Sequence, residues 1–433
     1  MTRIRWVALT WIMSSCVLSA FWGFSLMRTS PILMVDFKAY YYGARCLLQH
    51  HDPYDVSELE EVYRTDGGKH PLETIKARQA VTININLPTT LIFVAPFAML
   101  PWGAAHLLWT ILTAGSLIIA AFLVWDLGAN YAPAISGVLI CFVLANTEAF
   151  FPFGNPAAIA ISLCLVAVWC FLKNRFIWAG ILCLAISLAI KPNDAGLVWL
   201  YFLLAGGLNR KRALQILLVT AVLGLAAIAW VTPIAPHWMQ ELHSNLLAAS
   251  AHGGISDPGP ANANNVRGPG MIICLQSAVA IFRDDPRVYS AVSYLVCVPP
   301  LLIWAIRTLR SRFSQTNAWL ALAAIAPLTI LAAYHRLYDT KLLLLAVPAC
   351  AMLWARGGSI RWLALLVTSA GFVFTGDMSL TILRIVTNNL HISTTKLSGQ
   401  ILTVVLMRPT ELVLLLMSIF YLWVYLRREP EKD

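Results

Sequence analysis

The chain is built from long apolar stretches that are separated by short charged connections. Of its 433 residues, 59% are hydrophobic and 12% are charged, whereas an ordinary soluble domain carries roughly 25% charged residues. A membrane-spanning helix needs about 20 mostly apolar residues, so the apolar content suffices for about twelve spans. This composition excludes a soluble globular enzyme, a disordered chain and a nucleic-acid-binding module. It predicts an all-α polytopic membrane protein embedded in a lipid bilayer.

The net charge of +10 arises from basic residues that lie in short clusters between the apolar stretches. Such clusters mark cytoplasmic loops under the positive-inside rule. With every cluster in the cytoplasm, the predicted spans alternate without contradiction and both termini are cytoplasmic. The clusters are Arg3 and Arg5; Lys173 and Arg175; Arg210–Arg212; Arg307, Arg310 and Arg312; Arg356 and Arg361; and Arg427, Arg428 and Lys432.

This topology gives a single membrane domain, residues 1–433, with three large segments on the extracytoplasmic side. They are residues 28–86, with interfacial helices, residues 236–287 and residues 377–408. The number of crossings between Asn86 and Phe150 stays open, because no basic residue orients that stretch. The stretch from His237 to Arg267 is rich in Asn, Gly, Pro and His, so no regular helix is expected there.

The first external segment opens with an amphipathic helix that begins at Asp36. Its apolar residues recur at helical spacing and include tyrosines, which favour the membrane interface. These residues are Phe37, Tyr40, Tyr41, Ala44, Leu47 and Leu48. In this interpretation Asp36 is the N-cap, a structural role worth about 1 kcal/mol. A catalytic role for the same carboxylate is the alternative.

Three cationic or titratable residues, Lys191, His335 and Arg336, fall at the external ends of predicted spans. Ionisable residues at membrane depth are costly and usually functional, although a lysine or arginine can also reach the interface with its side chain. His335 and Asp339 have the spacing of two ligands on one helical face. The sequence near them offers no further ligand, so we predict no metal and no cofactor.

Several short motifs follow one another between about residue 30 and residue 350. They are Asp36-Phe37 with Tyr41-Tyr42 and Asp52-Pro53-Tyr54; Leu87-Pro88 with Pro96, Leu100-Pro101 and Trp109; Gly154-Asn155; Lys191-Pro192; and His335 with Tyr338-Asp339. Their order resembles glycosyltransferase family 87, whose members include polyprenyl-phosphate-mannose-dependent α-mannosyltransferases. The resemblance implies a GT-C-type helical bundle of about 12 transmembrane helices with a large first extracytoplasmic loop.

The resemblance also implies an activity and a site. The chain would be an inverting glycosyltransferase that moves a sugar, mannose first, from a polyprenyl monophosphate donor to a hydroxyl of a glycolipid or polysaccharide acceptor. Asp36 would be the general base, and Lys191, His335 and Arg336 would bind the donor phosphate. The expected substrate-binding residues are Tyr41, Tyr42, Arg45, Asn155, Asn264, Asn265, Tyr338 and Asp339.

Two other functions fit a membrane protein of this composition. A glycolipid transporter or flippase of the cell envelope predicts polar residues in the middle of spans and paired broken helices. An inactive scaffold of envelope assembly predicts no particular site. Because the ionisable residues gather at external span ends, the sequence favours chemistry on the extracytoplasmic face. The resemblance to the family implies a bacterial inner membrane.

Overall fold

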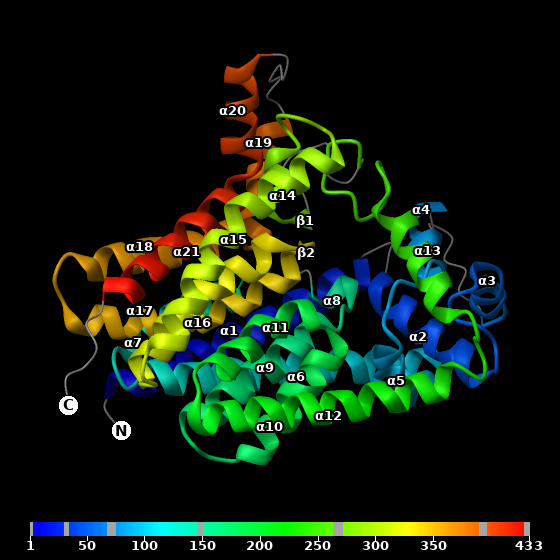
Figure 1. Ribbon diagram of the computed structural model, residues 1–433, viewed down its shortest axis with the longest axis horizontal. Helices are drawn as coiled ribbons and strands as arrows, with labels where there is room; N and C mark the ends of the chain where they lie inside the picture. The colour runs from blue at the N-terminus through cyan, green and yellow to red at the C-terminus, as the bar shows by residue number, and fades with distance from the viewer. Residues whose placement is uncertain are drawn as a thin grey trace.

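The computed structural model describes residues 3–29, 34–66, 75–145, 150–262, 272–388 and 396–427. These residues fold almost entirely into helices, and one small two-stranded sheet is present among them (Figure 1). The fold is therefore the all-α class that the apolar stretches predict.

The helices of the first half alternate between long apolar rods and short connecting helices. They are α1 (Arg3–Thr29), α2 (Val35–Leu48), α3 (Val56–Thr65), α4 (Ile75–Thr82), α5 (Pro88–Ala98), α6 (Trp102–Gly128), α7 (Pro133–Leu144), α8 (Phe150–Phe153), α9 (Ala157–Leu172), α10 (Ile177–Ile190) and α11 (Pro192–Leu204).

The second half contains the sheet and one 3₁₀-helix, η1. Its elements are α12 (Gly207–Val231), α13 (Trp238–Ser250), β1 (Ile272–Ile273), α14 (Leu275–Val279), α15 (Pro286–Arg310), α16 (Gln315–Ala332), β2 (His335–Arg336), η1 (Leu337–Leu345), α17 (Ala346–Arg356), α18 (Ile360–Phe374), α19 (Asp377–Asn388), α20 (Leu397–Met407) and α21 (Pro409–Arg427). The two strands are antiparallel and pair Ile272 with Arg336 and Ile273 with His335.

Within the described ranges, six helices are long and apolar enough to cross a membrane: α6, α12, α15, α16, the continuous η1–α17 pair and α21. Shorter apolar helices, including α9 and α10, pack beside them. Exposed leucines such as Leu218 and Leu295 cover the long helices, as a lipid-facing surface requires. The chain is therefore an integral membrane protein, and the total of about twelve spans stays a prediction.

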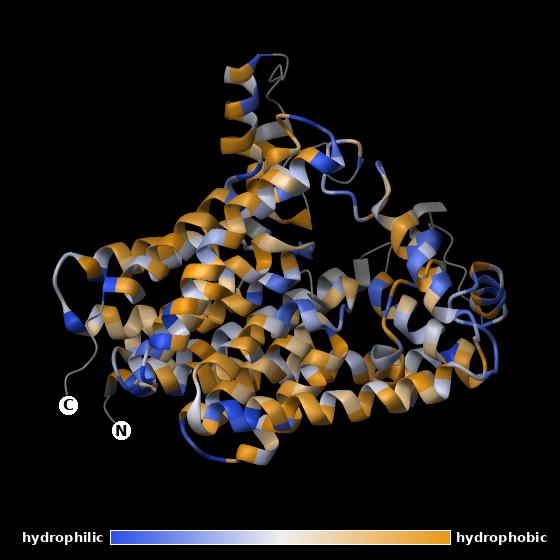
Figure 2. Ribbon diagram, viewed as in Figure 1, coloured by the Kyte–Doolittle hydropathy of each residue, from blue (hydrophilic) through white to orange (hydrophobic). Residues whose placement is uncertain are grey.

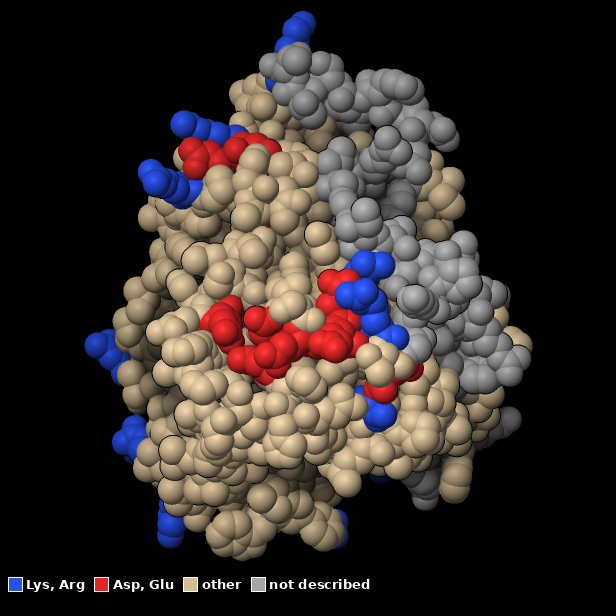
Figure 3. All heavy atoms as spheres, turned by 90° about the vertical axis from the view of Figure 1, so that its right-hand side faces the viewer, with Lys and Arg blue, Asp and Glu red and all other residues tan. Residues whose placement is uncertain are grey.

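Long helices such as α6, α12 and α16 run roughly along the longest axis of the molecule, whereas α20 stands across it (Figure 1). The start of α1 and the end of α21 lie at one end, and α2, α3, α4 and α13 gather toward the opposite end. Figure 2 shows hydrophobic residues along the long helices and hydrophilic residues mainly at their ends. The end that carries α3 and α13 also displays a concentration of acidic side chains (Figure 3).

The predicted span boundaries agree closely with the helices. From the apolar stretches and the basic clusters between them, the sequence predicts spans at 156–172, 176–190 and 409–426, among others, and these correspond to α9, α10 and α21. The expectation of no regular helix between His237 and Arg267 was wrong, because α13 forms there. Its Leu242, Asn245 and Ala249 are buried on one side, so packing stabilises a helix before the glycine-rich composition begins.

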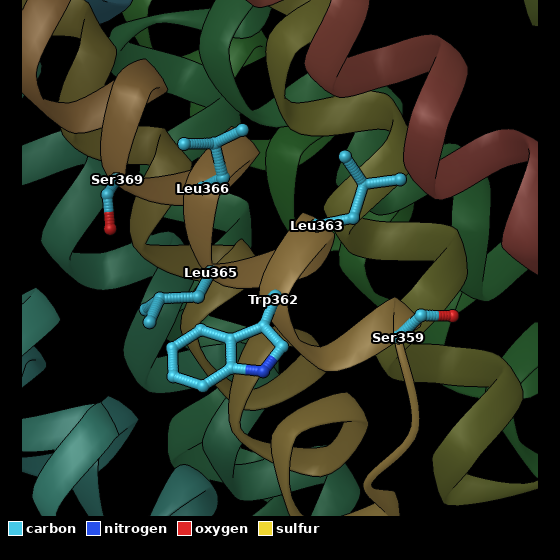
Figure 4. A pocket seen from close by; sticks show the side chains of 6 residues that line it. All are labelled: Ser359, Trp362, Leu363, Leu365, Leu366 and Ser369. Atoms are coloured by element: carbon cyan, nitrogen blue, oxygen red, sulfur yellow. The ribbon is translucent and has the colours of Figure 1, made fainter.

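A hollow of ≈580 Å³ opens on the surface of α18 (Figure 4). It is lined by Ser359, Trp362, Leu363, Leu365, Leu366 and Ser369. Its wall is mainly apolar, and Trp362 and Leu366 are well exposed. An apolar surface of this kind suits contact with lipid chains. The polar residues described below do not line this hollow.

Two buried hydrophobic clusters hold the fold together. One joins α9, α16, α17 and α21, and the other surrounds α2, α5 and the N-terminal part of α6. Phe153 packs against both. The turn that follows Phe153 therefore lies at the junction of the two clusters, and the polar site is built there.

Candidate active site

Asp36 lies in the first turn of α2, with its side chain half-buried. Met34, two residues before Asp36, adopts a left-handed conformation, and its backbone N–H donates to Pro152 O at 2.6 Å. Met34 is the N-cap, and no side chain caps this helix. The N-cap role expected for Asp36 was therefore wrong, because the helix starts earlier and leaves the carboxylate free for other contacts.

Two residues from distant parts of the chain contact the Asp36 carboxylate. Asn155 Nδ2 donates to Asp36 Oδ2 at 2.8 Å, and the Tyr338 hydroxyl donates to the same oxygen at 3.0 Å. Asn155 Nδ2 also donates to the Tyr338 hydroxyl oxygen at 2.8 Å. We call these three residues the Asp36 triangle. Neutral donors orient the carboxylate without pairing it with a cation.

Local structure holds Asn155 in place. Its side-chain oxygen accepts the backbone N–H of Ala157 at 2.9 Å at the start of α9. Gly154 has φ +64°, and a Cβ there would lie 2.8 Å from side-chain atoms of Met34 and Phe37. The glycine thus permits both the left-handed turn and the close approach of α2, which brings Asp36 to Asn155.

Four ionisable side chains, Lys191, Asp194, His335 and Asp339, lie directly beneath the triangle and form what we call the charged cluster. Lys191 Nζ pairs with Asp339 and lies 3.4 Å from Asp194 Oδ2. His335 Nε2 lies 3.1 Å from Asp194 Oδ1. The Lys191 ammonium is 5.1 Å from the centre of the Tyr338 ring, so the charged cluster and the triangle are in contact.

A break between two apolar helices delivers Lys191 to this position. Pro192 begins α11, and the residue before a proline disfavours helical geometry; Lys191 has φ −148° and ψ 81°. Thr90 Oγ1 donates to Ile190 O at 3.0 Å, and Thr89 bonds Ala189 O. These hydroxyls satisfy carbonyls that the interrupted helix leaves without partners.

Arg336 provides a cation beside the triangle. Its Nε donates to the Tyr334 hydroxyl at 2.5 Å, and its side chain is partly exposed. The backbone N–H of Arg336 donates to Asp339 Oδ2 at 2.7 Å, which ties β2 to the charged cluster. Tyr334 and Asp36 both interact electrostatically with the guanidinium and raise its pKa, although burial opposes this. Arg336 therefore stays charged, within electrostatic range of Asp36.

The environment raises the pKa of Lys191 and the pKa of His335. Burial lowers the pKa of Lys191, but Asp194 and Asp339 raise it by more, so the pKa lies above its usual value. Burial likewise lowers the pKa of His335. The hydrogen bond and charge of Asp194 and the charge of Asp339 outweigh this, so the pKa of His335 is also raised.

Comparison with known proteins assigns the chain to a family. The model of glycosyltransferase family 87 matches residues 85–334, more than half of the chain. The chain belongs to glycosyltransferase family 87. A search of curated proteins and a search of solved structures find no match. Asn155, Lys191 and Asp194 lie inside the matched region, whereas Asp36 precedes it and His335 follows it.

The fold of this family 87 glycosyltransferase brings together seven of the residues singled out from the sequence. They are Asp36, Asn155, Lys191, His335, Arg336, Tyr338 and Asp339. Although the positions are up to three hundred residues apart, they form one continuous polar site. Asn264 and Asn265 lie outside the described residues.

Three other expected substrate-binding residues, Tyr41, Tyr42 and Arg45, lie further along α2 with different partners. The Tyr41 hydroxyl donates to Leu100 O at 2.8 Å, and Tyr42 packs edge-on against Tyr63. Arg45 pairs with Asp66 and donates to Ala98 O at 3.0 Å. These contacts anchor α2, and a role in substrate binding stays a prediction for all three.

The geometry does not favour the metal interpretation of His335 and Asp339. His335 turns toward Asp194, and Asp339 turns toward Lys191, so the two side chains have different partners. Within the described ranges, no three His, Cys, Asp or Glu side chains are grouped so that they could hold a metal ion.

Three residues near the site were not predicted from the sequence: Asp194, Tyr334 and Tyr40. Asp194 is an acidic residue at the start of a predicted apolar span, and such a position indicates function; it was overlooked beside Lys191. Tyr334 is recognisable only through its contact with Arg336. Tyr40 lies one helical turn after Asp36 on α2, and burial and the charges of Asp36 and Asp339 raise its pKa.

Proposed function

We propose that this protein is an inverting glycosyltransferase of the GT-C type that uses a polyprenyl monophosphate sugar, with mannose as the first candidate sugar. The acceptor is a hydroxyl of a glycolipid or polysaccharide. The reaction takes place on the extracytoplasmic face of a bacterial inner membrane, and both termini are cytoplasmic. In support of this orientation, the termini share one end of the molecule and α2 lies toward the other (Figure 1).

The observation that carries the proposal is the setting of Asp36. Its carboxylate is half-buried, neutral donors from Asn155 and Tyr338 orient it, and the charge of Arg336 lies nearby. A general base needs a fixed position within reach of the acceptor hydroxyl. A leaving phosphate needs a cation aimed at the charge that develops on it. Asp36 and Arg336 supply these two requirements side by side.

The proposed reaction is a single displacement. The acceptor hydroxyl gives its proton to an Asp36 oxygen while the acceptor oxygen forms a bond to the anomeric carbon of the sugar. The bond from that carbon to the phosphate oxygen breaks, and its electron pair leaves with the polyprenyl phosphate. Because the acceptor attacks opposite the leaving group, the configuration inverts, and a β-linked donor gives an α-linked product.

The three proposed phosphate-binding residues have different surroundings. Arg336 is partly exposed and meets the donor phosphate directly. Lys191 and His335 lie deeper, beside Asp194 and Asp339, and contribute positive charge beneath the phosphate. Asn155, Tyr338 and Asp339, which were expected to bind substrate, serve here by holding Asp36, Arg336 and Lys191.

Replacement of the base tests this function. Purified wild-type and Asp36→Asn proteins in detergent receive labelled polyprenyl-phosphate mannose and a membrane-lipid extract, with and without chelator. We expect transfer by the wild type, insensitive to chelator, and a loss of about 10²–10⁴-fold in the variant. Glu61→Gln, a matched change on the exposed surface of α3, serves as the control and should retain full transfer.

Equal transfer by wild type and Asp36→Asn would remove Asp36 from the mechanism. Movement of the labelled lipid across a vesicle bilayer without sugar transfer would instead favour a flippase. A requirement for the chelated metal would restore the metal interpretation of this site.

A further inference from the structure

His335 is fully buried, and acceptor atoms face the Nδ1 side of its ring. Nδ1 lies 3.0 Å from Ala333 O and 3.2 Å from Ile330 O. Both carbonyls belong to the end of α16, where the last carbonyl groups of a helix lack partners within it. Because a carbonyl oxygen only accepts hydrogen bonds, Nδ1 carries a proton.

The other ring nitrogen also faces an acceptor. Nε2 lies 3.1 Å from Asp194 Oδ1, and an ionised carboxylate only accepts. The amide nitrogen Nδ2 of Asn193 lies 3.2 Å from the same nitrogen, but Asn193 is exposed, and rotation of its amide group presents the oxygen there instead. Asp194 is buried and has no such freedom. Protons on both nitrogens make the ring an imidazolium.

The charge balance of the buried cluster agrees with this protonation state. When Asp194 and Asp339 are both ionised, they carry two negative charges, and Lys191 supplies one positive charge. With a neutral His335, one buried negative charge would lack compensation, which is strongly unfavourable. An imidazolium at His335 makes the charged cluster neutral.

We propose that Asp194 is a positioning residue that holds His335 as an imidazolium, so that the charged cluster is neutral when the donor phosphate binds above it. This inference deepens the proposed function and rests on it, because it treats the side of Arg336 as the phosphate side. If His335 lost its proton, the cluster would become anionic and repel the phosphate. Asp339 links the charged cluster to Arg336, because it pairs with Lys191 and accepts the backbone N–H of Arg336.

The groups that face His335 come from every element around it. Asp194 lies in α11 and Lys191 just before it, Asp339 comes from η1, and Arg336 is adjacent on β2. The paired strand β1 contributes only apolar isoleucines, and α16 contributes backbone carbonyls. Burial lowers the pKa of His335 and Lys191 acts in the same direction, but Asp194 and Asp339 raise it above its ordinary value.

A titration of His335 tests the pair without using the sugar chemistry. The full-length protein carries ¹⁵N-labelled histidine and is examined by NMR in detergent, and the His335 signal is identified by its absence in His335→Gln. We expect His335 to stay protonated at neutral pH in the wild type. In Asp194→Asn, the titration midpoint should move to lower pH by at least about one unit.

Asp126→Asn is the matched control. Asp126 also pairs with a lysine, at 2.9 Å from Lys173 Nζ. It lies far from the site: Trp109 of α6 donates to the Gly154 carbonyl beside Asn155, and Asp126 is about 25 Å further along the same helix. The amide substitution there should leave the His335 titration unchanged. Asp194→Glu keeps the charge and should restore most of the wild-type behaviour.

A second measurement connects the pair to donor binding. Binding of polyprenyl-phosphate mannose is measured against pH for the wild type and for Asp194→Asn. We expect binding by the wild type to weaken as pH rises through the midpoint of His335, and this transition should move to lower pH in the variant. Weakening by the same factor at every pH would reduce Asp194 to a structural residue and overturn the proposal.

The outcomes separate the two proposals. A neutral His335 at neutral pH in the wild type would overturn the inference even if Asp194→Asn failed to fold. An unchanged midpoint in a folded Asp194→Asn protein would overturn it as well. If the wild type bound no donor while the midpoint shifted as expected, the proposed function would fail, and the role of Asp194 in donor binding would fall with it.

Discussion

Asp36 and Asp194 are two carboxylates of one site, and their surroundings are opposite. Asp36 is half-buried, and its partners are an amide and a phenol, both of them neutral. Asp194 is fully buried, and its partners are a lysine and a histidine. Both residues occupy the first turn of a helix, so helix geometry does not explain the difference.

The difference fits the two roles that we propose, a general base for Asp36 and a fixed counter-ion for Asp194. A cation beside a carboxylate stabilises its charged form and so weakens it as a base. Neutral donors orient a carboxylate with a smaller loss of basicity. Asp36 is therefore suited to take a proton from a substrate, and Asp194 is suited to remain a fixed counter-ion.

Removal of the lysine shared by the charged cluster should have the largest effect on stability. Lys191→Met leaves Asp194 and Asp339 with His335 as their remaining cation among the described contacts. Loss of one partner from a buried ion pair typically costs about 3–5 kcal/mol. We expect a large decrease in the thermal unfolding temperature of the detergent-solubilised protein.

The control for this experiment is Asp36→Asn, since the asparagine retains the shape of a side chain that no cation neutralises directly. Its unfolding temperature should stay close to that of the wild type. The double variant Lys191→Met/Asp339→Asn removes one charge of each sign and should recover part of the loss. An unfolding temperature of Lys191→Met equal to that of the wild type would mean that Asp194 does not depend on its ion pair with Lys191. The contrast with Asp36 would then have no support in stability.

The fold was largely predictable because a bilayer allows few solutions. Every backbone polar group must be satisfied within a span, so a long apolar stretch becomes a helix, as α9, α10 and α21 show. Helix α13 was missed because its stability depends on tertiary packing of Leu242 and Ala249. The strands β1 and β2 were missed because two-residue strands leave no periodic pattern.

The candidate site was predictable as a set of residues but not as a set of contacts. Polar residues at the ends of apolar stretches identified Lys191 and His335, and the i, i+3 spacing from Lys191 could have added Asp194. The pairing of Asp194 with His335 follows only from the fold. Periodicity also could not separate Asp36 from Tyr41, because both lie on one short helix. Only the folded chain places one beside Asn155 and the other against Leu100.

The hydroxyl of Tyr338 tests whether neutral donors orient the base. Tyr338→Phe removes one of the hydrogen bonds to Asp36 and keeps the ring beside Lys191. A hydrogen bond to a charged group is worth about 1.5–3 kcal/mol, so we expect sugar transfer to fall by roughly 10–100-fold and the unfolding temperature to decrease by less than in Lys191→Met. Initial rates of transfer measure the effect.

Tyr41→Phe provides the matched comparison, because its hydroxyl donates to a backbone carbonyl away from Asp36. Its transfer rate should remain near that of the wild type. An equal loss in both variants would favour the substrate-binding role expected for Tyr41 from the sequence, and would weaken the special position given to Tyr338.

Glu241 offers a third kind of carboxylate, one that faces charges of its own sign. Burial and the nearby Asp52 and Asp55 raise its pKa to about 7 from 4.5. The folded protein therefore binds this proton more tightly than the unfolded chain. Stability from this residue is fully present below pH 4.5 and is lost as pH rises toward 7, the reverse of the usual behaviour of a paired carboxylate.

Glu241→Gln should accordingly raise the unfolding temperature slightly above pH 7 and leave it unchanged below pH 4.5. The gain should be small, about 1–2 °C, because the side chain is partly exposed and solvent screens the repulsion. Glu61→Gln, on the exposed surface of α3, should change neither value. A decrease above pH 7 in Glu241→Gln would mean that the ionised carboxylate stabilises the fold. In that case Glu241 would behave as a counter-ion, like Asp194. The contrast between neutral and charged surroundings of a carboxylate would then rest on Asp36 and Asp194 alone.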